Sequence, residues 1–123
     1  MAIRVLLVDD EPDMRVLVRL TLDRSEGIDV VGEASSGADA IVQVAELAPD
    51  VVLLDHMMPG LTGLETATRL FAECGDAAPR IVLFTAWADS DLADQAAAAG
   101  IHRFLSKDDF SLVASTIRDV AAG

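Results

Sequence analysis

The clearest structural signal in the chain is the run Val51-Val52-Leu53-Leu54-Asp55-His56-Met57-Met58-Pro59-Gly60-Leu61-Thr62-Gly63. Four apolar residues without alternation lead directly into a carboxylate, and a Pro-Gly pair then breaks the pattern. An apolar run of this kind is typical of a strand buried on both faces of a parallel sheet. Ligands of such sheets bind beyond the carboxyl ends of the strands, which is where Asp55 would lie. Taken alone, a turn or capping role for Asp55 would be the commoner interpretation.

Four further apolar runs, at residues 3–8, 28–34, 80–84 and 101–105, predict strands like the one at 51–54. Apolar residues recur at helical spacing between them. This spacing predicts helices over about 12–24, 38–48, 64–73 and 90–99, and a last helix that opens at Asp108 or Asp109. The alternation predicts an α/β domain with a five-stranded parallel, doubly wound sheet flanked by five helices. We expect residues 1–123 to form a single domain, with no output domain in this chain.

Local signals refine the helices. Pro12 suits the first turn of a helix, where its missing N–H costs nothing. The apolar stripe of the second helix is predicted to be Ala38, Ile41, Ala45 and Ala48. The residues of the last helix that we expect to face inward are Leu112, Val113, Thr116, Ile117 and Val120.

Composition narrows the class of protein. The chain has 123 residues, 52% hydrophobic but only 4% aromatic, which predicts an aliphatic core. A net charge of -12 argues against direct contact with nucleic acid or an anionic membrane. No apolar run approaches the roughly 18 residues that a membrane-spanning helix needs. The one cysteine, Cys74, has no partner for an internal disulfide and no metal-site spacing, so we expect a cytoplasmic protein.

Polar side chains follow the ends of four predicted strands, and these ends meet at one edge of the sheet. The residues are Asp9 and Asp10, Asp55, Thr85 and Lys107. Three carboxylates held close together repel one another unless a cation neutralises them. Oxygen ligands with room for water suit Mg²⁺, with Mn²⁺ as an alternative. We expect Thr85 and Lys107, on the opposite side, to bind the oxygens of a phosphoryl group, which completes the parts for phosphoryl transfer to a carboxylate.

Lys107 is the only lysine in a chain that has eight arginines. An ammonium is a compact point charge, unlike a planar guanidinium, so its use at a strand end indicates a specific role. A solvated surface lysine is the competing interpretation.

Four motifs together resemble a response-regulator receiver domain, the signal-accepting module of two-component systems. They are Val8-Asp9-Asp10-Glu11-Pro12, Leu53-Leu54-Asp55 with Met58-Pro59-Gly60, Phe84-Thr85-Ala86, and Phe104-Leu105-Ser106-Lys107. Each motif is weak alone, but their order on successive strands is specific, and the resemblance covers residues 3–121. It implies the flavodoxin-like receiver fold.

The resemblance also implies roles for residues. Asp55 would accept a phosphoryl group from a histidine kinase or a phosphotransfer protein. Asp10, Asp55 and the Met57 carbonyl would ligate Mg²⁺, with Asp9 acting through water. Thr85 and Lys107 would contact the phosphoryl oxygens, Phe104 would be the switch aromatic, and Trp87 would border the site and modulate loss of phosphate. The chain would not be an enzyme beyond its own phosphorylation and autodephosphorylation.

The fourth helix, fifth strand and fifth helix would form the face that engages an output partner or a missing effector domain. Because the fourth helix and fifth strand offer only Arg103 as a basic residue, the charged dimer network of some family members is not expected. We expect a monomer or a weak, phosphorylation-dependent dimer, with no direct contact to nucleic acid or membrane.

Three departures from the family pattern bear on the site. Asp108 stands where many receivers have Pro, so a cis peptide after Lys107 is not expected. His56 should point away from Asp55 if strand geometry persists, which favours a non-ligand role. His102 is expected to be a half-exposed packing residue on the fifth strand.

Two other classes of function compete. A haloacid-dehalogenase-like phosphatase also forms an aspartyl phosphate, but it places aspartates at i and i+2, whereas Asp9 and Asp10 are adjacent. A pseudo-receiver would bind a partner without phosphorylation. The intact set of acceptor, acidic pair, Thr85 and Lys107 argues against that alternative.

Overall fold

Strands and helices alternate throughout residues 2–123, the part of the chain that the computed structural model describes. The strands are β1 (Ile3–Val8), β2 (Ile28–Ala34), β3 (Val51–Leu54), β4 (Arg80–Thr85) and β5 (Arg103–Ser106). The helices are α1 (Pro12–Asp23), α2 (Gly37–Leu47), α3 (Gly63–Cys74), α4 (Ser90–Ala98) and α5 (Val113–Ala122), with short 3₁₀ helices η1 (Gly75–Ala77) and η2 (Lys107–Leu112).

All neighbouring strands pair in parallel, in the order β2-β1-β3-β4-β5. The predicted doubly wound α/β sheet is therefore confirmed. The chain runs from β1 outward to β2 and then returns to the other side of β1 as β3. In open α/β sheets this reversal of strand order leaves a crevice beyond the carboxyl ends of the two central strands. The ends of β1 and β3 are in register, with Val8 opposite Leu54.

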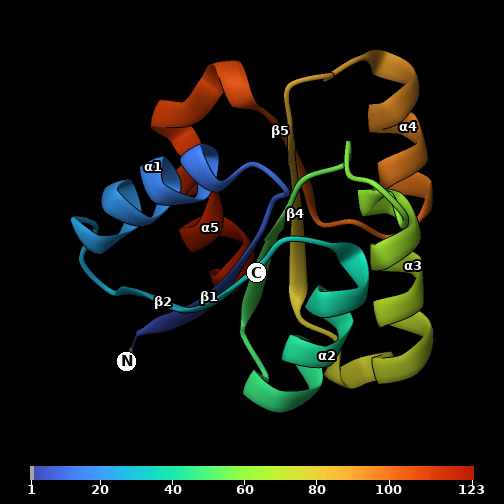
Figure 1. Cartoon of the computed structure of the whole chain (residues 1–123), viewed down its shortest axis with the longest axis horizontal. Coiled ribbons are helices and arrows are strands. Elements are labelled where there is room, and N and C mark those ends of the chain that lie inside the picture. The colour runs from blue at the N-terminus through green and yellow to red at the C-terminus, as the bar shows by residue number, and fades with distance from the viewer. Residues whose placement is uncertain (1) are drawn as a thin grey trace.

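Two helical layers enclose the sheet. Helices α1 and α5 cover one face, while α2, α3 and α4 cover the other (Figure 1). Because side chains alternate along a strand, each central strand supplies both layers. The side chains that pack toward α1 and α5 include Val5, Leu7, Val51, Leu53, Val82 and Phe84. Those that pack toward α2, α3 and α4 include Leu6, Val8, Val52, Leu54, Ile81 and Leu83.

The predicted apolar stripe of α2 was wrong at three of its four positions. Ala38, Ala45 and Ala48 are exposed, and only Ile41 packs against the core. The buried stripe consists of Gly37, Ala40 and Val44, with Ile41 and Leu47 partly buried beside them. The observed stripe adds Val44 and Leu47 to Ile41, whereas the predicted stripe had alanines at its other three positions, so more apolar area is buried per turn.

Two boundaries near the C-terminal end also differ from the prediction. β5 begins at Arg103 rather than Ile101, so His102 precedes the strand. The segment after Lys107 is the 3₁₀ helix η2, and α5 begins only at Val113. Leu112 is consequently 49% exposed, although we predicted that it would face inward. The Ser106 side chain caps η2 by accepting a hydrogen bond from the Asp108 N–H.

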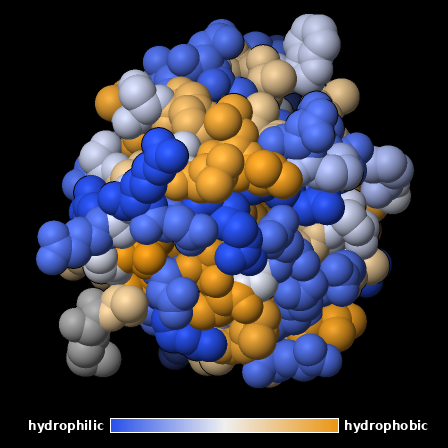
Figure 2. Space-filling model, turned by 60° about the vertical axis from the view of Figure 1, so that its left-hand side comes forward, coloured by the Kyte–Doolittle hydropathy of each residue, from blue (hydrophilic) through white to orange (hydrophobic). Residues whose placement is uncertain are grey.

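Helix α1 buries Val18 and Leu22 but exposes three large apolar side chains, Val16, Leu17 and Leu20. Figure 2 shows the side of the molecule that carries α1, with hydrophobic residues in patches between hydrophilic ones. No helix within residues 2–123 has the length and apolar character needed to cross a bilayer.

The loop between β3 and α3 depends on two glycines. Gly60 has φ +76°, a backbone conformation that L side chains rarely adopt. Gly63 begins α3 in close contact with the end of β3, and a Cβ there would lie 2.4 Å from the Asp55 carbonyl oxygen. A capping box between Thr62 and Glu65 fixes the start of α3. These features hold the backbone directly after Asp55 in place.

Candidate functional site

Four acidic residues meet at the carboxyl ends of β1 and β3. Asp9, Asp10, Glu11 and Asp55 each offer a carboxylate oxygen, and these oxygens all lie within 4.8 Å of one another. Asp9 and Asp55 continue the strand faces of Leu7 and Leu53, so both point toward the α1 and α5 layer. Asp9 is only 6% exposed and Asp55 only 3%.

The predicted convergence of Asp9, Asp10 and Asp55 at one edge of the sheet is therefore observed. Hydrogen bonds of the sheet fix their backbone: the Asp9 N–H donates to the Ala34 carbonyl, and the Asp55 N–H donates to the Val8 carbonyl at 2.9 Å.

Lys107 lies among these carboxylates. Its Nζ is 2.7 Å from Asp9 Oδ2 and 3.2 Å from Asp55 Oδ2, and its side chain is 7% exposed. Glu11 Oε1 is more distant, at 3.9 Å from Nζ. The ammonium expected at this edge of the sheet therefore lies in direct contact with two of the carboxylates. The reason is that two buried carboxylates need a cation in contact with them, and Lys107 is the one that reaches both.

The pKa values of the two central groups follow from this arrangement. Burial raises the pKa of the Asp55 carboxyl, the Lys107 charge opposes the rise, and the Asp9 charge adds to it. Burial alone would lower the pKa of Lys107, but its hydrogen bond to Asp9 and the charges of Asp55 and Asp9 outweigh burial and raise it. Lys107 therefore remains charged at neutral pH, while Asp55 is a more basic carboxylate than an exposed one.

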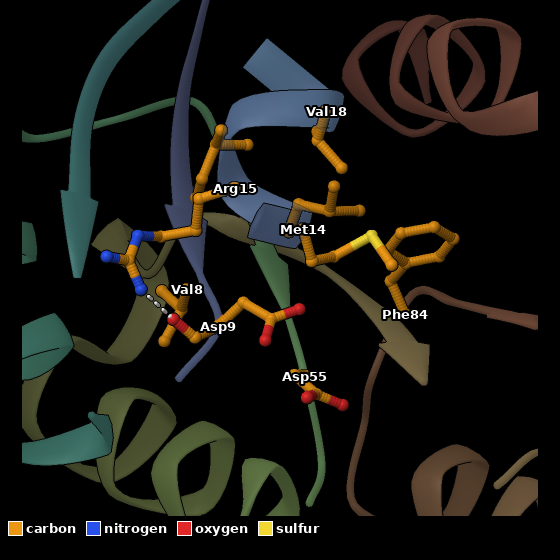
Figure 3. Close-up of a pocket in the computed structure, with 9 residues that line it drawn as sticks. Val8, Asp9, Met14, Arg15, Val18, Asp55 and Phe84 are labelled. Carbon is orange, nitrogen blue, oxygen red and sulfur yellow. Dashed lines mark hydrogen bonds between the residues drawn. The ribbon is translucent and has the colours of Figure 1, made fainter. Parts of the chain in front are cut away.

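A small pocket adjoins the two aspartates on the α1 side of the sheet (Figure 3). Met14, Arg15 and Val18 of α1 and Phe84 of β4 line it together with Asp9 and Asp55. In Figure 3 the Arg15 side chain reaches across to the Asp9 carbonyl oxygen, to which it donates a hydrogen bond. The side-chain carboxylates of Asp9 and Asp55 lie on the other side of that carbonyl.

The end of β4 supplies Thr85, which is fully buried. Its Oγ1 accepts a hydrogen bond of 3.4 Å from the Trp87 N–H. Trp87 itself is 68% exposed. With Met57, which is 53% exposed, it lines a surface groove between the β3–α3 loop and α4. The Met57 N–H donates to Asp55 Oδ1 at 3.4 Å, so the groove adjoins the phosphoacceptor candidate.

The two histidines and Phe104 lie outside the acidic cluster. His56 Nδ1 accepts a hydrogen bond of 3.4 Å from the Leu64 N–H, which confirms that this side chain points away from Asp55. His102 is exposed rather than half-exposed, and its Nδ1 accepts from the Ile81 N–H at 3.1 Å. Phe104 is half-buried against the core layer formed with α2, α3 and α4. The peptide bond after Lys107 is trans, as expected.

Two residues of the site were not predicted from the sequence. Glu11 belongs to the acidic cluster, and its position directly after Asp9-Asp10 was an available signal. Arg15 lines the pocket and holds the Asp9 carbonyl. Its only sequence signal was a basic residue one helical turn after Glu11, in a helix whose other face is apolar.

The cluster fits a hard divalent cation. Carboxylate oxygens from two neighbouring strands approach one another closely, two of them are buried, and a carboxylate-only donor set suits Mg²⁺ or Mn²⁺ rather than zinc or copper. One ammonium already offsets part of the negative charge. A carboxylate, a cation site and an ammonium in one crevice are the groups required for phosphoryl transfer.

Comparison with known proteins gives a consistent family. The family model described as "Response regulator receiver domain" matches residues 5–117. A protein-glutamate methylesterase/protein-glutamine glutaminase from Myxococcus xanthus is 45% identical over 85% of this chain, which covers 30% of that protein. The response regulator UvrY of Escherichia coli is 39% identical over 98% of this chain and 55% of its own length. The transcriptional regulatory protein LiaR of Bacillus subtilis is 34% identical, over 98% and 57%.

Solved structures agree with the fold. The signal receiver domain of the putative response regulator NarL from Mycobacterium tuberculosis has a TM-score of 0.92 at 33% identity, covering 99% of this chain and 98% of that one. The response regulator domain of Thermotoga maritima CheB has a TM-score of 0.90 at 28% identity, covering 100% and 98%. The chain spans between about a third and somewhat over half of the curated relatives named above.

Proposed function

The chain belongs to the response regulator receiver family of two-component systems, and on that premise we propose that it accepts a phosphoryl group on Asp55. The donor is a histidine kinase or a phosphotransfer protein. The observation that carries the proposal is the contact of Lys107 with both Asp9 and Asp55 inside an acidic crevice at the switch point of the sheet. A buried carboxylate with a raised pKa beside an ammonium is a suitable nucleophile for an anionic donor.

Mg²⁺, which Mn²⁺ can replace, would be held by Asp10, Asp55 and the Met57 carbonyl, with Asp9 acting through water. When bound, the cation neutralises the carboxylates and the phosphoryl oxygens so that donor and acceptor can approach. In the transfer, an Asp55 carboxylate oxygen forms a bond to phosphorus as the donor's nitrogen–phosphorus bond breaks, and the electron pair of that bond returns to the imidazole. Lys107 and the Thr85 hydroxyl would then contact the phosphoryl oxygens.

The proposed response is a conformational switch. Thr85 would move toward the phosphoryl group, and the half-buried Phe104 would turn inward. Both residues lie beside the face formed by α4, β5 and α5, where we place the output partner or an effector domain outside this chain. Residues 1–123 would form one receiver domain, in the cytoplasm, with no direct contact to nucleic acid or membrane.

The oligomeric state is part of the same proposal: a monomer or a weak dimer that depends on phosphorylation. Arg103, the basic residue of β5, pairs with Asp119 of α5 in the same chain at 3.4 Å between Nη2 and Oδ2. That pairing leaves few basic groups on this face for a charged dimer network.

A turnover experiment separates a receiver from a phosphatase with an aspartyl-phosphate intermediate. Acetyl phosphate with Mg²⁺ should add one phosphoryl group per chain, which intact-mass measurement detects. p-Nitrophenyl phosphate should release no nitrophenol beyond the rate of Asp55→Asn. Repeated, Asp55-dependent hydrolysis of the ester would contradict the receiver assignment and favour the phosphatase.

We further predict that Trp87→Ala shortens the lifetime of the phosphoprotein. The indole lies at the opening beside Met57, and hydrolysis requires a water molecule to align with the Asp55 oxygen–phosphorus bond. A bulky side chain at that opening should hinder the alignment, so its removal should speed phosphate loss severalfold. The measurement is phosphate release after acetyl phosphate is removed. An unchanged lifetime would leave Trp87 as a surface residue with no effect on the reaction.

A further inference from the structure

Arg15 connects the acidic site to the outer edge of the sheet. It lies on α1 and is 19% exposed, and its Nη1 donates a hydrogen bond to the Asp9 carbonyl oxygen (Figure 3). It lines the same pocket as Asp9 and Asp55. Because a guanidinium donates but never accepts, Arg15 has no capacity to bind a cation, and its contact with the site is through Asp9.

The other side of the Arg15 guanidinium is anchored on β2. Its Nε is 3.2 Å from Glu33 Oε1, while Arg19, one turn further along α1, has its Nε 2.7 Å from Glu33 Oε2. The Glu33 carbonyl accepts a further hydrogen bond from Gln43 of α2 at 2.6 Å. Glu33 is thus fixed in position and holds Arg15 in turn.

Asp9 is held at each of its polar atoms. Its N–H donates to the Ala34 carbonyl, its Oδ1 accepts from the Glu11 N–H at 2.9 Å, and its Oδ2 accepts from Lys107. The carbonyl is the remaining atom, and Arg15 occupies it. Among these partners, Arg15 is the side chain that comes from α1. Its positive charge is paired with Glu33.

We propose that Arg15, anchored by Glu33, is a positioning residue for the divalent-cation site. It fixes the turn Asp9–Glu11 so that mutually repelling carboxylates stay within reach of one cation. The inference rests on the proposed cation site and adds to it a residue that touches neither cation nor phosphoryl group. Groups that orient the ligands of a metal commonly change its affinity by roughly tenfold or more when they are replaced.

The sign of the effect separates positioning from simple electrostatics. Removing a positive charge near the site should, by Coulomb's law alone, tighten cation binding. Loss of the hydrogen bond to Asp9 should loosen it, because the turn can then relax away from Asp55. Arg15→Gln therefore tests one mechanism against the other.

Arg19→Gln is the matched control. Like Arg15→Gln, it removes one positive charge and one contact with Glu33, but from the next turn of the same helix. The hydrogen bond from Arg15 to the Asp9 carbonyl remains. Arg15→Lys keeps the charge, but its single nitrogen does not span both Asp9 and Glu33 as the guanidinium does. Glu33→Gln removes the charge that anchors Arg15 and leaves only a neutral oxygen that can accept from its Nε.

The experiment uses the metal alone, without a phosphoryl donor. Free Mn²⁺ is counted by its electron paramagnetic resonance signal during titration of each variant, Mg²⁺ is added as competitor, and urea unfolding confirms that each variant is folded. We expect Arg15→Gln to weaken Mn²⁺ binding roughly tenfold. Arg15→Lys and Glu33→Gln should lie between it and the wild type, and Arg19→Gln should bind as tightly as the wild type or slightly more tightly.

If the results differ from these expectations, Asp55→Asn shows whether the proposed cation site or only the proposed role of Arg15 is wrong. Wild-type binding that Asp55→Asn leaves unchanged, or no binding at all, would overturn the cation site itself. Binding that depends on Asp55 but is unaltered or tightened in Arg15→Gln would overturn only the role of Arg15. Equal weakening in Arg15→Gln and Arg19→Gln would also overturn it, because the effect would then come from α1 as a whole. Should Arg15→Gln not fold, Arg15→Lys and Glu33→Gln carry the same comparison.

Discussion

At the scale of single residues, Lys107 has the most demanding environment in the described part of the chain. Its side chain is 7% exposed, and its ammonium contacts two buried carboxylates. Burying such a charge costs desolvation free energy unless the charge is paired, and removal of one partner leaves an uncompensated buried charge. The sequence offered the position of Lys107 and its uniqueness among eight arginines, but not the direct contact with Asp9 and Asp55.

Replacement of Lys107 by arginine should impair phosphorylation even though the charge is kept. A planar guanidinium is larger than an ammonium and does not fit the same short contacts of 2.7 and 3.2 Å to Asp9 and Asp55. We expect the initial rate of labelling by acetyl phosphate to fall by at least roughly tenfold, as for loss of a single charge-stabilising contact.

The control for this exchange is Arg103→Lys, at an exposed surface pair, which should not change the labelling rate. Beryllofluoride mimics the phosphoryl group, and Trp87 beside the site serves as a fluorescent reporter of the response. If Lys107→Arg were labelled as fast as the wild type and showed the same change in Trp87 fluorescence with beryllofluoride, the role given to Lys107 would be wrong.

We predict that His102, which lies outside the acidic cluster, makes the stability of the native state depend on pH. Although His102 as a whole is exposed, its Nδ1 is part-buried against Ile81, and this desolvation, with the nearby charge of Arg80, lowers the pKa of His102 in the folded chain. Its Nδ1 accepts a hydrogen bond from Ile81 at the start of β4, and the ring lies edge-on to Phe71 with 6.1 Å between centroids. Protonation would turn that acceptor into a donor facing another donor.

The sign of the pH effect follows from the direction of the shift. Between the lowered folded pKa and the unfolded value near 6.5, the unfolded chain binds more protons, so the stabilisation by His102 is lost as pH falls through this range. In His102→Asn the amide oxygen can take the place of Nδ1 without titrating. We expect the free energy of unfolding in urea to fall less between about pH 7.5 and 5.5 in this variant than in the wild type.

His102→Ala is the comparison that isolates the acceptor, and it should be less stable than His102→Asn throughout this pH range. Parallel pH curves for the wild type and His102→Asn would show that His102 makes no contribution to the pH dependence.

At the scale of elements, the start of α3 shows two rules in conflict. Alanine is a better helix former than glycine by about 1 kcal/mol. A Cβ at Gly63, however, would lie 2.4 Å from the Asp55 carbonyl oxygen and 2.8 Å from the His56 Cα, and both are backbone atoms that cannot swing aside. The close approach is what brings α3 against the end of β3.

We predict that Gly63→Ala destabilises the protein by about 1–3 kcal/mol, because overpacking against the backbone outweighs the gain in helix propensity. Urea unfolding measures the change. Gly123→Ala serves as control, since the nearest atom to its Cβ would be at an ordinary 3.5 Å. Increased stability of Gly63→Ala would mean that the β3–α3 loop relaxes and does not hold Asp55 in place.

Sequence patterns located the strands better than the faces of the helices. Largely apolar segments bounded by turn residues predicted β1, β2 and β3 at their observed bounds, although only β3 is an unbroken apolar run. The buried face of α2 was predicted wrongly because the helix is rich in alanine, which occurs both in cores and on surfaces. The spacing of its residues therefore did not distinguish the exposed Ala38 and Ala45 from the buried Ala40. Periodicity gave no signal for the start of β5, where the His102 N–H donates to the Ile81 carbonyl, or for η2, which the Ser106 side chain caps by accepting from the Asp108 N–H.

At the scale of the whole molecule, the strand order accounts for the site. β1 and β3 are neighbours, in register, and their pleat directs Asp9 and Asp55 to the same face. The sequence sufficed to predict which residues gather at this edge, because the carboxyl ends of parallel strands lie together. It did not suffice for Arg15, whose role depends on β2 passing beside α1 so that Glu33 meets the guanidinium.

The central claim is that this arrangement makes Asp55 the phosphoacceptor and that a divalent cation is required. The most direct measurement is incubation with acetyl phosphate, trapping of the acyl phosphate by borohydride reduction, and identification of the modified residue by peptide mass spectrometry. We expect modification at Asp55 in the presence of Mg²⁺, none in EDTA, and none at that position in Asp55→Asn. Modification at another residue of the wild type, or equal modification of Asp55 in EDTA, would contradict it.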